Sequence, residues 1–149
     1  MKRIVTTIYL LLLLLPAVAC SVPPAQLQTA SAKTTVAKSV SADVTPETLA
    51  VQMMQSAPPL VLDVRSAREY AAGHIPGAIN VEHREVRSHL DQLQAFQNRH
   101  VVLYCEWGVR ARRAEAVLLD AGFTNLSHLS GHMPAWRAAG FPIEVGTSE

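Results

Sequence analysis

The sequence predicts an α/β fold in which a mostly parallel β-sheet carries helices on both faces. Two continuous apolar runs, residues 60–64 and 101–104, lack the alternation of a half-exposed strand and therefore indicate strands buried on both sides. Segments with helical features separate the apolar runs, and strands that alternate with helices are typical of parallel sheets. The 149 residues, of which 49% are hydrophobic, are enough for one modest core.

The remaining elements follow from local signals. Thr45 and Pro46 predict a helix start. The Thr45 hydroxyl can accept one of the unpaired N–H groups of the first turn, and Pro46 lacks the N–H that would be unpaired at the first helical position. Ser66 and Glu69 form a capping box that predicts a short helix ending near residue 72. We further expect strands at residues 78–81 and 126–129, and helices at residues 84–94, 110–121 and 133–139.

Charge and residue spacing exclude several classes of partner. The formal net charge is +1, and no basic stripe with interleaved aromatic residues is present, so we expect no nucleic-acid partner. The cysteines and histidines lack the spacing of metal ligands, and we expect neither a metal nor a cofactor. The two cysteines, Cys20 and Cys105, stand in such different contexts that a disulfide framework is not expected.

The N-terminus has the pattern of a targeting segment. Lys2 and Arg3 precede a short apolar run that ends in small residues, which is typical of a secretory signal peptide, with an uncleaved anchor as the alternative. Residues 17–20, which read Ala-Val-Ala-Cys, resemble the bacterial lipobox and imply a lipid on Cys20. We expect a signal peptide at residues 1–19, lipidated Cys20 with a flexible linker through residue 43, a folded domain at 44–145 and a tail at 146–149. The protein would then lie in the cell envelope, facing the periplasm, and on the outer membrane in a Gram-negative host.

Cys105 stands between a predicted strand and a predicted helix. Unpaired backbone N–H groups and the positive end of the helix dipole meet at such a position. This environment lowers the pKa of a thiol and produces a nucleophile, and the same N–H groups can bind an anion. The sequence therefore predicts one reactive sulfur.

Three segments together resemble the single-domain form of the rhodanese family of sulfurtransferases. The first runs from residue 62 to 80 and includes His-Ile-Pro-Gly-Ala at 74–78; the second is the cysteine loop with its helix, 104–123; the third is 129–142. In family order they cover nearly all of residues 44–145. The resemblance implies a rhodanese-like fold with Cys105 as the catalytic residue, and a loop formed by Glu106, Trp107, Gly108, Val109 and Arg110.

The resemblance also implies a reaction. The Cys105 thiolate would take a sulfane sulfur from thiosulfate or a persulfide, and the Cys105 persulfide would pass it to a thiol or cyanide. Covalent catalysis of this kind predicts ping-pong kinetics. Backbone N–H groups of residues 106–110 would surround the terminal sulfur. We expect small-molecule substrates and a monomer, membrane-attached through the acyl chains on Cys20.

Two alternatives remain open on the sequence. Only four residues separate Cys105 from Arg110, which matches the sulfurtransferase loop and argues against the longer loop of related phosphatases and arsenate reductases. The other alternative is a rhodanese-like module that carries persulfide or binds a partner without turnover. Glu106 keeps this alternative open, because a carboxylate that pointed inward would repel an anionic donor and raise the pKa of the thiol. Ala111 also stands where a hydroxyl residue is frequent in the family.

Supporting roles are expected for residues outside the loop. Asp63 interrupts an apolar strand and needs polar partners. The family resemblance implies that this acid braces backbone near the loop and that Arg65 pairs with Glu69. His74 is expected to brace its turn.

Two residues of the loop itself have alternative interpretations. Arg110 would stabilise the thiolate or the anionic donor, with a surface ion pair as the alternative. Trp107 would either line the mouth of the pocket or cover nearby core as a rim residue.

Overall fold

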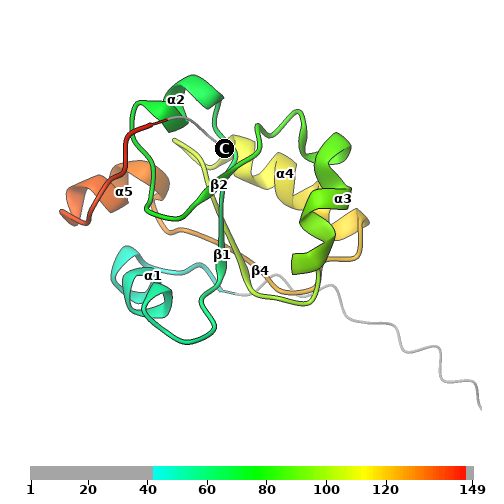
Figure 1. Cartoon of the computed structure of the whole chain (residues 1–149), viewed down its shortest axis with the longest axis horizontal. Coiled ribbons are helices and arrows are strands. Elements are labelled where there is room, and N and C mark those ends of the chain that lie inside the picture. Colours follow the sequence, from blue (N-terminus) through cyan, green and yellow to red (C-terminus); the bar gives the residue numbers. More distant parts are fainter. Residues whose placement is uncertain (1–41, 147–149) are drawn as a thin grey trace, which may run out of the picture. The chain divides into compact units, whose positions relative to one another are not determined.

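Four parallel strands form a sheet whose carboxyl edge carries the cysteine loop (Figure 1). The computed structural model describes residues 42–146. The strands are β1 (Leu60–Asp63), β2 (Ile79–Asn80), β3 (Val101–Tyr104) and β4 (Leu126–His128), in the spatial order β2-β1-β3-β4. The predicted parallel sheet is confirmed, although β1, β2 and β4 are each one or two residues shorter than expected.

Five α-helices and two 3₁₀ turns surround the sheet. They are α1 (Pro46–Met53), α2 (Ala67–Ala71), η1 (Val86–His89), α3 (Leu90–Leu93), η2 (Gln94–Phe96), α4 (Val109–Asp120) and α5 (His132–Ala138). The expected caps are present: the Thr45 side chain accepts the N–H of Thr48, and Ser66 and Glu69 form the complete capping box of α2.

The single helix predicted at residues 84–94 is wrong. The chain instead forms η1, four residues of α3 and η2 in succession. The Glu85 carbonyl accepts hydrogen bonds from the Ser88 hydroxyl and lies 2.9 Å from Nδ1 of His89. Side chains that bond to a local carbonyl compete with the regular helical pattern, and this explains the tight first turn.

The two faces of the sheet are covered by different helices. Alternate residues of β1 and β3, such as Leu62 and Leu103, pack with α4, η1 and α3. The intervening residues, such as Val61 and Val102, pack with α1, α2 and α5. Because side chains alternate along a strand, each buried strand contributes to both cores. The prediction of helices on both faces is confirmed.

Strand register brings two functional segments together. Asp63 and Tyr104 are paired at the ends of β1 and β3, so Arg65 and Cys105 follow on neighbouring strands. In an open parallel sheet this carboxyl edge is where ligand sites form. None of the described helices is long and apolar enough to cross a membrane. Cys20 and the predicted signal peptide lie outside the described residues.

Candidate active site

Cys105 lies in a tight turn between β3 and α4. Gly108 is the residue before α4 and has a φ of 92°, a left-handed conformation that suits glycine. This conformation directs the Gly108 N–H to Sγ of Cys105, at 3.0 Å. The Cys105 side chain is buried, with 1% of the residue exposed. The first N–H groups of α4, which begins at the residue after Gly108, have no carbonyl partner within the helix.

The turn between β4 and α5 braces the cysteine loop from behind. The Met133 N–H donates to the Cys105 carbonyl at 3.1 Å. His132 packs against Gly108 so closely that a Cβ added to Gly108 would lie 2.6 Å from Nε2 of His132. His132 itself has a φ of 54°, and its Nδ1 is buried without a hydrogen-bond partner. The sequence contains no signal for this contact, because neither residue matches a motif that would place them together.

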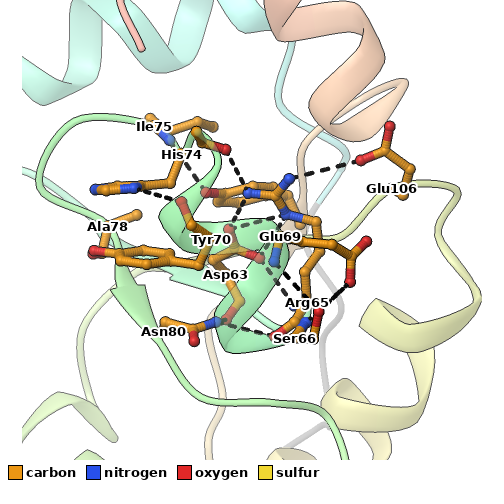
Figure 2. A network of polar contacts seen from close by, with 12 residues as sticks. Asp63, Arg65, Ser66, Glu69, Tyr70, His74, Ile75, Ala78, Asn80 and Glu106 are labelled. Carbon is orange, nitrogen blue, oxygen red and sulfur yellow. Dashed lines mark hydrogen bonds and ion pairs between the residues drawn. The ribbon is translucent and has the colours of Figure 1, made fainter. Parts of the chain in front are cut away.

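A buried arginine connects the end of β1 to the cysteine loop (Figure 2). Arg65 donates to Asp63 through Nε, at 3.0 Å, and through Nη2, at 2.6 Å, and both side chains are buried. Nη2 also donates to the carbonyl of Gly73, at 2.8 Å. Burial opposes the charge of Arg65, but hydrogen bonds and charge from Asp63 outweigh it, so the pKa of Arg65 is raised. The predicted pairing of Arg65 with Glu69 is wrong, because Asp63 is nearer along the strand edge and occupies the guanidinium.

The Glu106 carboxylate forms ion pairs with two arginines. Its carboxylate lies 3.1 Å from Nη1 of Arg137 on α5 and 3.7 Å from Nη1 of Arg65. The carboxylate considered from the sequence as a free charge beside the thiol is thus paired with two guanidiniums. The carboxylate joins the cysteine loop to α5 and to the end of β1, and the two guanidiniums offset its charge.

Glu69 binds Arg110 and so connects α2 to α4. The two guanidinium nitrogens of Arg110 donate to the two carboxylate oxygens of Glu69 at 2.6 and 2.7 Å. The hydrogen bond from Arg110 lowers the pKa of Glu69 to about 2. The same bond raises the pKa of Arg110, and the charge of Cys105 adds a smaller contribution. The ion-pair interpretation of Arg110 is thus the one found, with Cys105 within electrostatic reach.

His74 braces its turn, as expected. Its Nδ1 lies 2.9 Å from the carbonyl of Tyr70, and the two rings stack with centroids 3.6 Å apart. The Tyr70 hydroxyl donates to the carbonyl of Ala78, and the Ile75 N–H donates to the Tyr104 hydroxyl (Figure 2). These bonds fix the turn against β3.

The outer rim of the loop is apolar and exposed. Trp107 is 77% exposed and Val109 is 58% exposed. Most of the Trp107 side chain is therefore open to solvent. Among residues 42–146, no group of three or more histidine, cysteine or acidic side chains is arranged to hold a metal ion.

The sequence is similar to a known domain family and to several known proteins. The sequence matches the rhodanese-like domain over residues 45–139. It is 40% identical over 88 residues to the HTH-type transcriptional regulator Rv0324 of Mycobacterium tuberculosis, covering 58% of this chain and 38% of the regulator. It is 36% identical over 84 residues to tRNA uridine(34) hydroxylase of Yersinia enterocolitica, covering 54% of this chain and 24% of the hydroxylase.

The fold is also similar to that of a solved structure. The crystal structure of thiosulfate sulfurtransferase from Pseudomonas aeruginosa superposes with a TM-score of 0.62 and 31% identity, covering 73% of this chain and 20% of that one. This chain spans less than half the length of each of the three proteins.

Proposed function

Because this chain belongs to the family of rhodanese-like domains, we propose that it is a sulfurtransferase that carries sulfane sulfur as a persulfide on Cys105. The donor is thiosulfate or a persulfide, and the acceptor is a thiol or cyanide. In the first step the Cys105 thiolate attacks the outer sulfur of thiosulfate. A sulfur–sulfur bond forms to Cys105, and sulfite leaves with the electron pair of the broken bond. In the second step the acceptor anion attacks the terminal sulfur, and Cys105 leaves as a thiolate.

The arrangement around the sulfur is the observation that carries this proposal. Sγ of Cys105 is buried and accepts the N–H of Gly108, and α4, whose first N–H groups have no partner within the helix, begins at the next residue. These donors stabilise a negative charge on the sulfur or on the next sulfur atom. Glu106 does not weaken this support, because its carboxylate is held by Arg137 and Arg65.

Turnover of thiosulfate and cyanide tests the proposal directly. We expect the full chain to form thiocyanate with ping-pong kinetics, and Cys105→Ser, which replaces only the sulfur, to form none. Equal thiocyanate formation by Cys105→Ser would contradict the proposal. Cys105-dependent hydrolysis of an aryl phosphate would instead assign the site to phosphatase chemistry.

A second candidate is a persulfide-carrying or partner-binding module without efficient turnover. It is favoured by the relatives named as a transcriptional regulator and a tRNA hydroxylase, in which the matched region is a minor part of the protein. The same assay separates the two: a persulfide that forms on Cys105 but yields no thiocyanate supports the carrier.

We also propose that Cys20 is lipidated and tethers the protein to the cell envelope. The support is the lipobox-like sequence that ends at Cys20 and the apolar run before it. Cys20→Ser should release the protein from membranes without loss of sulfurtransferase activity. Membrane association that survives this substitution would contradict the tether.

A further inference from the structure

The rim of the cysteine loop combines exposed apolar side chains with arginines that lack acidic partners. Val109 begins α4, and Arg112 and Arg113 follow it by three and four residues, so the three side chains share one face of the helix. Both arginines are exposed, and neither forms an ion pair with another described residue. Arg110, which follows Val109 directly, is instead bound to Glu69.

The positive charge extends beyond α4. His83 follows β2 and its N–H donates to the carbonyl of Val64, which places it beside the end of β1. Burial lowers the pKa of His83 first, and the charges of Arg84, Arg110 and Arg113 lower it further, with Glu82 opposing them. Arg84 is exposed and, like Arg113, has no ion pair within the described part of the chain. Because Glu69 offsets the charge of Arg110, Arg84 and Arg113 remain on this side against the single charge of Glu82.

Trp107 and the buried sulfur suggest the size of the occupant. Sγ of Cys105 lies in a residue that is 1% exposed, whereas Trp107 is 77% exposed. The exposed Trp107 ring thus offers apolar area to an occupant of the loop in addition to the buried sulfur. A polypeptide segment that crosses the loop would contact both, and tryptophan and arginine are the residues that contribute most to binding at protein interfaces.

We propose that this rim, formed by Trp107, Val109, Arg112, Arg113 and Arg84, docks an acidic segment of an acceptor protein whose cysteine receives the sulfur. The proposal rests on the sulfurtransferase function above. The acceptor thiolate attacks the terminal sulfur of the Cys105 persulfide, the sulfur–sulfur bond to Cys105 breaks, and Cys105 leaves as a thiolate. One persulfide is consumed and one is formed, so no oxidant or reductant is needed. The arginines attract the acidic segment and offset repulsion between the two anions.

Two peptide measurements on the full chain test the proposal. In the transfer assay, protein preloaded with thiosulfate is mixed with cysteine peptides that differ only in flanking Asp and Glu, Ser, or Lys residues, and with glutathione. In the binding assay, the same peptides with Ser in place of Cys are added to the protein in increasing amounts. Binding is followed by the change in tryptophan fluorescence, to which the exposed Trp107 contributes. The binding assay needs no sulfur transfer, so it separates failure of docking from failure of the enzymatic function.

We expect the acidic peptide to bind best and to receive sulfur about tenfold faster than the basic peptide at low salt. The combined substitution Arg112→Gln and Arg113→Gln should remove this preference, as should high salt. Arg99→Gln is the matched control, because Arg99 is exposed at the opposite end of β3 and donates to the carbonyl of Pro58. It should keep the preference.

Several outcomes would overturn the docking proposal. Equal rates and equal binding for acidic and basic peptides would do so, as would a preference that survives loss of both arginines. Binding to phosphatidylglycerol vesicles that depends on Arg112 and Arg113, without any peptide preference, would assign the rim to a membrane surface instead. Acidic-peptide binding without transfer would support docking and count against the sulfurtransferase function.

Discussion

At the scale of single residues, Gly108 meets two requirements at once. Its positive φ turns the N–H towards Cys105, and its lack of a Cβ leaves room for the His132 ring. The first requirement follows from local backbone geometry and is foreseeable from the sequence, whereas the second is not. A glycine between a strand and a helix suggests a left-handed turn, whereas the contact with His132 arises from the distant turn before α5.

Gly108→Ala should therefore weaken both the fold and the site. A left-handed alanine costs about 1–2 kcal/mol, and the Cβ must also displace His132. We expect slower persulfide formation on Cys105 as well as a lower free energy of unfolding. Gly140→Ala is the control, since Gly140 has a φ of 72° with nothing within 4 Å of an added Cβ. A Gly108→Ala variant that loads sulfur as fast as Gly140→Ala would refute this role.

Glu106 is the residue whose interpretation the structure changes most. An inward carboxylate would make Glu106→Ala a gain-of-function substitution. The observed contacts with Arg137 and Arg65 predict the reverse, because the loop loses its attachment to α5. We expect Glu106→Ala to slow sulfur loading from thiosulfate, and Arg137→Gln, which removes the same 3.1 Å contact from the other side, to slow it to a similar degree. Faster loading by Glu106→Ala would show that its charge, and not its attachment, dominates.

At the scale of elements, one residue of the short helix α2 both caps that helix and connects it to α4. Glu69 caps α2 through Ser66 and also binds Arg110 at the start of α4. The capping box is visible in the sequence, because its two residues are three positions apart. The bond to Arg110 is not visible, since it joins residues 41 positions apart and depends on the strand order.

The Glu69–Arg110 pair should contribute to stability only above a low pH. The pKa of Glu69 is about 2 in the folded chain against an ordinary 4.5, so the unfolded state binds the proton first as pH falls. The contribution is complete above pH 4.5 and is lost towards pH 2. Glu69→Gln retains a capping side chain and removes the charge, so its unfolding free energy should fall less steeply across that window. Parallel acid slopes in denaturant unfolding of the two proteins would contradict this assignment.

Element boundaries show where the sequence signals are strong. The buried strands and the cysteine helix were predictable because their apolar patterns are continuous and their ends are marked by turns. The segment 84–94 was not, because an i, i+4, i+7 pattern reports which face is buried and not which hydrogen bonds form. The hydrogen-bond pattern of this segment depends on local contacts of Ser88 and His89 with the Glu85 carbonyl.

At the scale of the whole molecule, three half-buried histidines should make the fold sensitive to mild acid. Burial lowers the pKa values of His83, His100 and His132 below the ordinary 6.5. These histidines therefore take up a proton at a lower pH in the folded chain than in the unfolded chain. The contribution of these histidines to the free energy of unfolding is therefore complete above pH 6.5. It declines as pH falls below 6.5, because the unfolded chain takes up these protons first.

His100 offers a direct test of that sensitivity. Its ring is half-buried and lies 3.0 Å from the hydroxyl of Ser127. His100→Gln keeps a hydrogen-bonding side chain that does not titrate, so its unfolding free energy should decline less between neutral and mildly acidic pH. An unchanged decline would show that other groups cause it.

The account of the molecule depends on Cys105 as a sulfur carrier. The most direct measurement is the intact mass of the full chain after exposure to thiosulfate, for wild type and Cys105→Ser. We expect wild type to gain the mass of one sulfur atom, located on Cys105 by peptide mapping and removed by cyanide, and Cys105→Ser to gain none. A wild-type chain that gains no sulfur from thiosulfate or from a low-molecular-weight persulfide would contradict the central claim.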